Sequence, residues 1–431
     1  MSTATSLREE VTELLQALLR VDTVNPPGNE TRAAEVLRDY LAASSVACEL
    51  VGRTPDRANL VARIGGGDGP SLGFLCHTDT VLADPAEWTR NPWSGDVVDG
   101  DVWGRGALDM KGQVAAEAVA FASLAREGFV PAGELVFIAT ADEEVGVGFG
   151  LQWLVEAHPH LVRVDFALNE GGGERAVLRD AVYYLCGVAE KLSAPFRLRV
   201  RGRSGHASVP GIADNALVKA AAIISLLAAY TPPPELIPEV RRLFEVTIGE
   251  LPAPEEALAR ATDVFGPAAA ELVEPLLGPT FSPTMIGASD VFNVIPGVCD
   301  VTVDCRLLPG ASPDDLEPLL RSVVGAGWEL EFVERVGGTR SALDTPLWTA
   351  LDDYVGAIEP GARLVPSCNP GFTDSHYLRE AFGTVAYGFL PMRAMEAELA
   401  ARLEHAADER VAIDDLELGV DALRHVARAL L

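Results

Sequence analysis

The chain has 431 residues, of which 48% are hydrophobic and 23% charged, so it can bury a sizeable core and is not globally disordered. Because one core stops growing at about 250–300 residues, this length predicts two structural units. A formal net charge of −29 argues against a nucleic-acid partner, since phosphates would be repelled and no block of Lys or Arg offsets the charge.

The N-terminus and the cysteines predict a cytoplasmic protein without a membrane partner. The first ten residues lack a basic stretch followed by an apolar run, so they do not resemble a secretory signal. No window approaches the roughly 20 apolar residues that span a bilayer. The six cysteines are scattered and form no CxxC pair, which predicts reduced, buried thiols.

Helical and strand patterns alternate in the first part of the chain. Apolar residues at helical spacing predict helices at 7–19, 30–43, 111–127 and 151–157. Short apolar runs bounded by turn signals predict strands at 60–64, 72–76, 135–140 and 164–168. The first two strands, separated by a Gly-rich turn, are expected to be neighbours. The alternation predicts an α/β fold with a largely parallel, helix-covered sheet.

The pattern changes at about residue 191. Residues 196–201 alternate apolar and basic side chains, which predicts a strand with one face in water. Further helices are predicted at 215–230, 253–277 and 312–324, and further strands at 301–307 and 328–333. We therefore predict a smaller α/β domain at 191–337, inserted into a catalytic domain formed by 1–190 and 338–431.

Side chains that bind metals follow three predicted strands, in the segments 77–79, 142–144 and 169–170. Catalytic groups in open α/β sheets gather beyond the carboxyl ends of strands, so these segments are expected at one edge. Another carboxylate, Asp109, precedes the helix at 111–127. Singly, a His-x-Asp pair, a Glu-Glu pair and a helix-capping Asp have ordinary structural explanations. Together, the carboxylates would repel one another without a cation, which predicts a metal site.

The mixed imidazole and carboxylate donors favour zinc, with cobalt or manganese as substitutes, because thiolate ligands are absent. Two metals about 3.5–4 Å apart require a bridging carboxylate, and a water held between them becomes a nucleophile near neutral pH. Asp109 is the natural bridge, so two divalent ions are expected.

Five ordered motifs carry a family resemblance. They are His77-Thr-Asp79, Gly106-Ala-Leu-Asp109-Met-Lys-Gly, Asp142-Glu143-Glu144, Asn169-Glu170-Gly-Gly and His405-Ala-Ala-Asp-Glu-Arg-Val. In this order they resemble the M20 metallopeptidases, a family of aminoacylases, desuccinylases, deacetylases, dipeptidases and carboxypeptidases. The resemblance covers essentially the whole chain, from Val24-Asn-Pro-Pro-Gly to His405.

The resemblance implies two metal sites that share one carboxylate. Their ligands would be His77, Asp109 and Glu170 for the first metal, and Asp109, Glu144 and His405 for the second. Asp79 would orient the first imidazole. Glu143 would be the general base, which takes a proton from the bridging water and returns it to the leaving amine. Adjacent residues of an extended segment point opposite ways, so Glu143 and Glu144 can hold different roles.

The resemblance also implies that the inserted domain is a lid through which two chains dimerise. His206 in Arg-Ser-Gly-His-Ala-Ser would reach the substrate carbonyl or its oxyanion, from its own or from the partner subunit. Without the family match, His206 would be assigned to a surface turn. Asn293 and Arg306 would contact the substrate, and a guanidinium suits a carboxylate because it donates two parallel hydrogen bonds.

One segment departs from the family pattern. Gly371 and Thr373 resemble the Gly-x-Thr-Asp segment that lines the family's pocket, but His376 stands where the family often has Arg. This leaves open how the carboxylate end of a substrate is held. His376 also competes with His405 for the last metal position, and the Glu409-Arg-Val that follows His405 favours His405.

Together these features predict a homodimeric hydrolase that cleaves an amide bond beside a free carboxylate. Deacylation of N-acyl amino acids is the preferred reaction, and carboxypeptidase or dipeptidase action on short peptides is the alternative. A catalytically silent relative that binds metal is a third hypothesis. The complete ligand set and Glu143 argue against it, since a silent protein has no physical need for both.

Overall fold

The computed structural model describes residues 6–178, 180–266 and 273–431. The chain divides into two compact units. The first comprises Met1–Val188, Ser341–Ser367 and Thr373–Leu431, and the second Ala189–Arg340 and Cys368–Phe372. The short segment groups with the second unit, although it lies inside the range 338–431, because the N–H of Lys191 donates to the carbonyl of Asn369 (2.9 Å).

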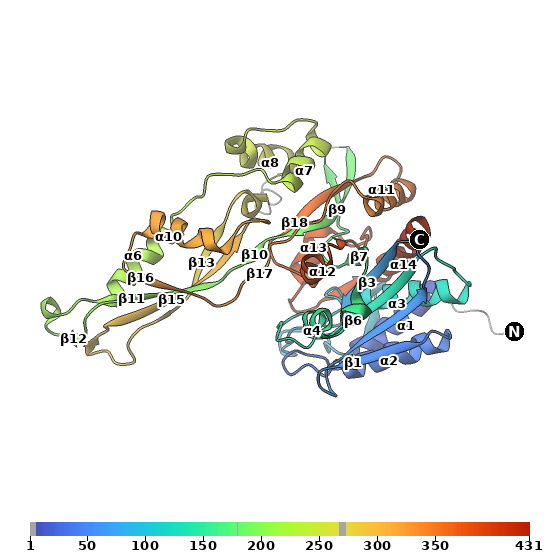
Figure 1. Ribbon diagram of the computed structural model, residues 1–431, viewed down its shortest axis with the longest axis horizontal. Helices are drawn as coiled ribbons and strands as arrows, with labels where there is room; N and C mark the ends of the chain where they lie inside the picture. Colours follow the sequence, from blue (N-terminus) through green and yellow to red (C-terminus); the bar gives the residue numbers. More distant parts are fainter. Residues whose placement is uncertain (1–5, 179, 267–272) are drawn as a thin grey trace. The chain divides into compact units, whose positions relative to one another are not determined.

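A nine-stranded mixed sheet forms the centre of the first unit (Figure 1). Its order is β1 (Cys48–Gly52), β2 (Ala58–Gly65), β6 (Glu134–Thr140), β3 (Ser71–His77), β7 (Phe166–Asn169), β19 (Val385–Gly388), β9 (Ala181–Glu190) and β18 (Arg363–Asn369), with β8 (Arg175–Leu178) on β9. The central strands β6, β3, β7 and β19 are parallel, whereas β1, β2 and β9 join antiparallel. The α/β class is confirmed, and the parallel part of the sheet is its centre.

β2 and β3 are not neighbours, and that prediction was wrong, because β6 lies between them. The Gly-rich turn after β2 does not close a hairpin. Its amides at Gly66 and Gly67 donate to the carbonyl of Gly133, just before β6, at 3.1 and 3.2 Å. A Cβ at Gly67 would lie 2.1 Å from the carbonyl oxygen of Ala132, so the crossing needs glycine. The turn therefore passes over the start of β6 and leads the chain to β3 beyond it.

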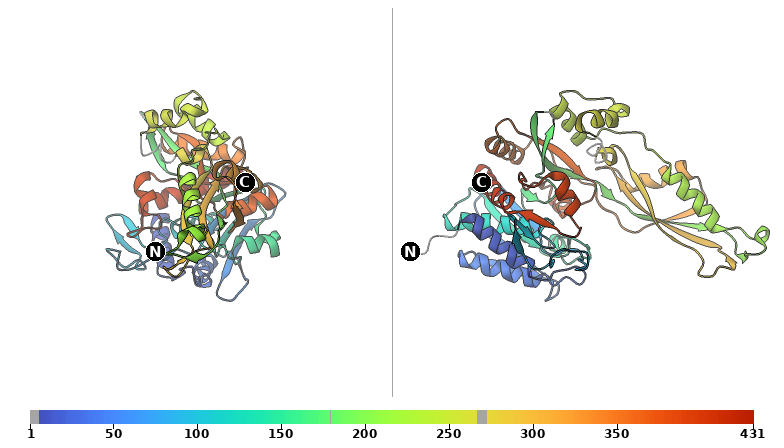
Figure 2. Two further views of the ribbon diagram at one scale, coloured as in Figure 1. Left: turned by 90° about the vertical axis from the view of Figure 1, so that its left-hand side faces the viewer. Right: turned by 180° about the vertical axis from the view of Figure 1, so that it is seen from behind.

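Helices cover both faces of this sheet (Figures 1 and 2). Phe137 of β6 lies against Phe121 of α3, with ring centroids 6.0 Å apart. Val136 and Ile138 point the other way and share a buried cluster with Leu154 of α4. The helices of this unit are α1 (Leu7–Leu19), α2 (Thr31–Ala43), α3 (Lys111–Arg126), α4 (Leu151–Ala157), α5 (Pro159–Val162), α11 (Pro346–Ile358), α12 (Ser375–Phe382), α13 (Ala397–Leu403) and α14 (Ile413–Leu430).

A small sheet brings two distant segments of the first unit together. β20 (Arg410–Ala412) pairs antiparallel with β5 (Asp101–Trp103), which pairs with β4 (Asp96–Val98). The loop before β20 therefore lies beside the loop that leads into α3. None of the helices in the described ranges is long and apolar enough to cross a membrane. All six cysteines are free thiols, as expected, and five of them are buried.

The second unit has its own antiparallel sheet. Its order is β16 (Trp328–Phe332), β11 (Phe196–Arg201), β15 (Val298–Leu307), β10 (Leu192–Ser193) and β17 (Val336–Gly337), with β13 (Thr280–Gly287) on β15. A separate ribbon pairs β12 (Gly205–His206) with β14 (Val294–Ile295), and the helices are α6 (Ala216–Ala228), α7 (Pro238–Ile248), α8 (Ala257–Phe265) and α10 (Leu316–Val324).

The alternation predicted for residues 196–201 is confirmed in β11. Leu198 and its alternate neighbours are buried against α6 and α10. Arg199 points to the other face and pairs with Asp300 at 2.9 Å. The helix predicted at 253–277 is present in part as α8, and residues 267–272 of that range lie outside the described residues.

Candidate metal centre

The five predicted metal ligands and the predicted base lie at strand ends and on two loops of the first unit. They are His77 at the end of β3, Glu143 and Glu144 after β6, Glu170 after β7, Asp109 just before α3, and His405 on the loop before β20. Because β3, β6 and β7 run parallel, their carboxyl ends meet at one edge of the sheet. The fold therefore delivers these six side chains to one place.

Asp109 lies between the two imidazoles. Its Oδ1 is 3.0 Å from His77 Nε2, and its Oδ2 is 2.7 Å from His405 Nε2. Each imidazole also faces a second carboxylate, with Glu170 Oε2 at 3.5 Å from His77 and Glu144 Oε2 at 3.3 Å from His405. The structure thus brings the five predicted ligands together as two groups that share Asp109.

Electrostatics at this edge favour a bound cation. Burial raises the pKa of Glu170 to about 8 and also raises that of Glu144. Burial acts on Asp109 in the same direction, but hydrogen bonds from His405 and His77 outweigh it and hold its pKa well below its usual range. Within the described ranges no donor reaches the buried Oε1 of Glu144. Crowded carboxylates with an oxygen left unsatisfied fit a divalent ion, which would supply the missing partner.

Glu143 lies beside the proposed metal ligands, and its side chain is not hydrogen-bonded to Asp109. One of its carboxylate oxygens lies within 4.8 Å of ligand atoms of His77 and Glu170. Burial, followed by the charge of Glu170, raises the pKa of Glu143 well above its usual range. A carboxylate with a raised pKa is suited to accept a proton near neutral pH and to give it back.

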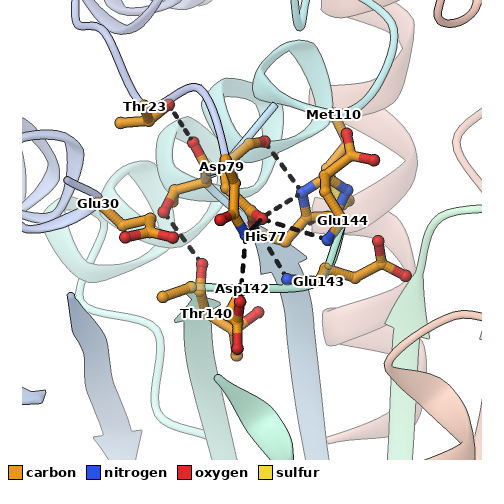
Figure 3. A network of polar contacts seen from close by, with 12 residues as sticks. Thr23, Glu30, His77, Asp79, Met110, Thr140, Asp142, Glu143 and Glu144 are labelled. Atoms are coloured by element: carbon orange, nitrogen blue, oxygen red, sulfur yellow. Dashed lines mark hydrogen bonds and ion pairs between the residues drawn. The ribbon is translucent and has the colours of Figure 1, made fainter. Parts of the chain in front are cut away.

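Asp79 makes more contacts than the orienting role implied by the family resemblance requires (Figure 3). Its Oδ1 lies 3.4 Å from His77 Nδ1, so it can orient the imidazole. The same carboxylate accepts the backbone N–H groups of Glu143 and Glu144, each at 3.2 Å. Asp79 therefore fixes one proposed ligand and the backbone of the proposed base.

Glu409 holds the two loops that carry Asp109 and His405, a role that the sequence left unassigned. Its carboxylate accepts three N–H groups from the loop before α3, including that of Asp109 at 3.1 Å. It also accepts a hydrogen bond from Arg105 at 2.6 Å, and Arg105 donates to the carbonyl of His405 at 3.1 Å. Glu409 belongs to the last motif, but nothing in that motif indicates its partners in the loop before α3.

Three of the predicted residues lie in the second unit. His206 is exposed on β12, and the residue after it donates its N–H to the carbonyl of Asn293 at 3.0 Å, so these two are neighbours. Arg306 lies near the far end of β15, and its Nε and Nη2 both donate to Asp304 at 3.0 Å. The structure does not place Arg306 beside His206. The guanidinium of Arg306 is already hydrogen-bonded to Asp304.

The remaining predicted residues surround the start of α12. Gly371 belongs to the short segment of the second unit, whereas Thr373 accepts the N–H of Ser375 through its Oγ1 at 3.2 Å. His376 is buried, with Nδ1 2.6 Å from the carbonyl oxygen of Thr373 and its ring against Tyr377. The two groups of potential metal ligands found in the described part of the chain are His77 with Asp109 and Glu144, and His77 with Glu143 and Glu170. Neither group includes His376 or His405, but Nε2 of His405 lies 2.7 Å from Asp109, whereas no such contact to Asp109 is found for His376 in the described residues.

A sequence model of one protein family, described as Peptidase family M20/M25/M40, matches residues 73–429. The chain belongs to this family. The predictions of M20 membership and of a metal-dependent hydrolase are therefore confirmed. A curated relative, the succinyl-diaminopimelate desuccinylase of Methylorubrum extorquens, is 30% identical over 418 residues that cover 94% of each chain.

Solved structures of M20 proteins have the same fold. The M20 family metallo-carboxypeptidase Sso-CP2 from Sulfolobus solfataricus has a TM-score of 0.71 and 19% identity, and the match covers 98% of this chain and 99% of the other. The Bacillus subtilis YXEP protein, described as a dinuclear metal binding peptidase from the M20 family, has a TM-score of 0.64 and 16% identity over 98% and 97% of the chains.

Proposed function

We propose that this M20 enzyme deacylates N-acyl amino acids by cleaving an amide bond beside a free carboxylate. The observation that carries the proposal is Glu143, placed beside His77, whose imidazole shares the carboxylate of Asp109 with that of His405. The desuccinylase relatives support deacylation, because their name describes the removal of an acyl group from an amino acid and they align over nearly the whole chain.

Two divalent ions complete this proposal. His77, Asp109 and Glu170 would hold one, and Asp109, Glu144 and His405 the other. The donor set of nitrogen and carboxylate oxygen suits zinc, with cobalt or manganese as substitutes. When bound, such ions polarise the scissile carbonyl and lower the pKa of water. The unsatisfied Oε1 of Glu144 supports this assignment.

The side chains of the protein would handle the protons. Glu143 accepts a proton from the attacking water as the water oxygen bonds to the acyl carbon. The carbon–nitrogen bond then breaks, and Glu143 returns the proton to the departing amine. Nδ1 of His77 lies 3.2 Å from the backbone carbonyl oxygen of Asp79 and 3.4 Å from its Oδ1, so Asp79 would accept the Nδ1 proton and leave Nε2 of the ring as the ligand atom toward a metal.

The second unit would act as the lid and dimerisation domain. We propose that His206 of one subunit donates a hydrogen bond to the carbonyl oxygen of a substrate bound in the other. This hydrogen bond would strengthen as negative charge develops on that oxygen. Arg306 would hold the substrate carboxylate after exchanging its bonds with Asp304. The further substrate contacts proposed are Asn293, Gly371 and Thr373.

Hydrolysis of matched substrates tests the reaction. N-acyl amino acids should be cleaved with kcat/KM at least about tenfold above that of dipeptides with the same C-terminal residue. N-acyl amino acid amides, which lack the free carboxylate, should be poor substrates. Removal of metal by a chelator should abolish activity, and zinc, cobalt or manganese should restore it.

The same panel separates the alternatives. If dipeptides are cleaved faster than N-acyl amino acids, the protein is a peptidase and not a deacylase. Binding of two metals without hydrolysis of any of these substrates would favour a catalytically silent relative. The M20 carboxypeptidase structure carries less weight than the desuccinylases here, because 19% identity shows the fold alone.

Mixed subunits test the proposed role of His206. His206→Ala and Glu143→Gln chains should each be nearly inactive alone. After they are unfolded and refolded together, activity should recover to about a quarter of the wild-type level if His206 acts across a symmetric dimer, because only heterodimers contain one complete site. Absence of recovery, with mixed dimers shown by mass spectrometry, would place His206 in the site of its own chain.

A further inference from the structure

Two buried aspartates hold the loop that presents Glu143. Asp79 accepts the N–H groups of Glu143 and of the next residue at 3.2 Å. Asp142 accepts two amides further along the loop through its Oδ2, at 2.8 and 3.0 Å. Asn25 joins the two aspartates, because its Nδ2 lies 2.9 Å from Asp79 Oδ2 and 3.1 Å from Asp142 Oδ1. Figure 3 shows both aspartates beside Glu143.

Asp142 needs this support because of its backbone. Its φ is +67°, in the left-handed region that residues other than glycine rarely adopt. Such a conformation persists when the surrounding contacts determine it. The turn at Asp142 sends the chain from β6 into the loop, so the direction of Glu143 depends on what holds the Asp142 carboxylate.

Arg57 supplies the positive charge for this arrangement. Its Nη2 donates to Asp142 Oδ1 at 3.0 Å, and its Nε and Nη2 donate to Glu30 at 2.7 and 2.5 Å. The guanidinium also lies 4.7 Å from the ring centroid of Phe149, a residue of the same loop. Arg57 is 8% exposed and Glu30 0%. Removing the guanidinium would leave the buried Asp142 and Glu30 without their cation.

The chain makes room for Arg57 at one glycine. Gly28 has a φ of +104°, and a Cβ there would lie 2.3 Å from Nε of Arg57. Gly28 ends the Val24-Asn-Pro-Pro-Gly segment, which also provides Asn25. One short segment therefore contributes both the amide that joins the aspartates and the space that the guanidinium occupies.

We propose that Arg57 is a positioning residue for the hydrolysis. By holding Asp142 and Phe149, it fixes the loop conformation in which Glu143 and Glu144 face the metal centre. Arg57 acts through these residues and contacts neither proposed metal ligand nor substrate. The inference rests on the proposed roles of Glu143 and Glu144. It adds that hydrolysis also requires Arg57, which is not one of the proposed metal ligands.

Arg57→Met tests the proposal, with Arg63→Met as its matched control. Arg63 lies near the other end of β2, where it pairs with Glu134 and donates to two carbonyls of α5. Arg57→Met should lower kcat about 10- to 100-fold, the usual cost of losing an outer support of a metal site. KM should stay within about twofold, because the substrate contacts remain. Arg63→Met should change thermal stability and leave kcat unchanged.

Hydrogen exchange of the metal-free proteins gives a readout that does not depend on turnover. Amides of residues 143–149 should exchange faster in Arg57→Met than in the wild type, and at the wild-type rate in Arg63→Met. Arg57→Lys keeps the charge but loses the bidentate geometry of the guanidinium. Its kcat and its exchange rates should therefore lie between those of Arg57→Met and those of the wild type. If Arg57→Met does not fold, Arg57→Lys carries the test.

The outcomes separate this inference from the proposed function. Unchanged exchange in both Arg57 variants would overturn the inference, and so would faster exchange with wild-type kcat. Equal losses of kcat in Arg57→Met and Arg63→Met would also overturn it, because the loss would then follow stability alone. Failure of the wild type to hydrolyse any N-acyl amino acid or dipeptide would instead overturn the proposed function, while the exchange rates would still report on the loop.

Discussion

Glu143→Gln is expected to lower kcat by about 10²- to 10⁴-fold while the protein still binds two metals per chain. Glutamine keeps the size of the side chain but cannot accept a proton from water. The N–H of residue 143 bonds to Asp79 and is unaffected by the change. Steady-state kinetics on an N-acyl amino acid, with metal content measured on the same samples, provide the test.

Glu156→Gln on α4 is the matched control for this prediction. Glu156 is exposed, and its carboxylate accepts a hydrogen bond from Gln152 on the same helix. Its loss of charge should leave kcat and metal content at wild-type values. An unchanged kcat in Glu143→Gln would show that Glu143 is not the general base. Loss of metal in that variant would show that Glu143 is a metal ligand.

His405→Ala is expected to lose about half of the bound metal, because one of the two proposed metals would lose its only imidazole. Nε2 of His405 faces Asp109 and Glu144, and the side chain is half exposed. Activity should fall by about 10²-fold or more, since both metals take part in the proposed chemistry. Metal analysis after dialysis, together with kcat, measures both effects.

His376→Ala provides the comparison that decides between the two histidines. His376 is buried beside Thr373 and Tyr377, so its removal should lower the free energy of unfolding but keep both metals. Thermal unfolding of both variants shows whether any metal loss follows from unfolding. If His376→Ala loses metal and His405→Ala keeps both metals, the last ligand position belongs to His376 and not to His405.

Elements with a regular apolar pattern were predictable from the sequence. The helix predicted at 7–19 has those bounds, because Val11, Leu14, Leu15 and Leu18 form one buried stripe and Ser6 caps its start. β13 was missed, since Pro283 and a register shift interrupt its alternation. β19 was missed because four residues are too few to show a period.

The candidate site was predictable where residues close in sequence act together. The motifs around His77 and Glu143 place a proposed ligand and the proposed base at strand ends, and the motif of Asp109 places the proposed bridge just before α3. The fold explains why the strand ends meet. The roles of Arg57 and Glu409 were not predictable, because each depends on contacts between segments far apart in the chain. Spacing within a motif carries no information about such partners.

The link between Glu409 and the loop before α3 has a consequence for how the protein is made. Glu409 accepts the N–H of Asp109, a residue that precedes it by 300 positions. During synthesis, β3, β6 and β7, which end at or just before His77, Glu143 and Glu170, leave the ribosome long before His405 and Glu409 do. The nascent chain can therefore build most of its sheet while it is still unable to hydrolyse anything. With the proposed ligand set, activity would begin only when the last loop brings His405 and Glu409 to Asp109.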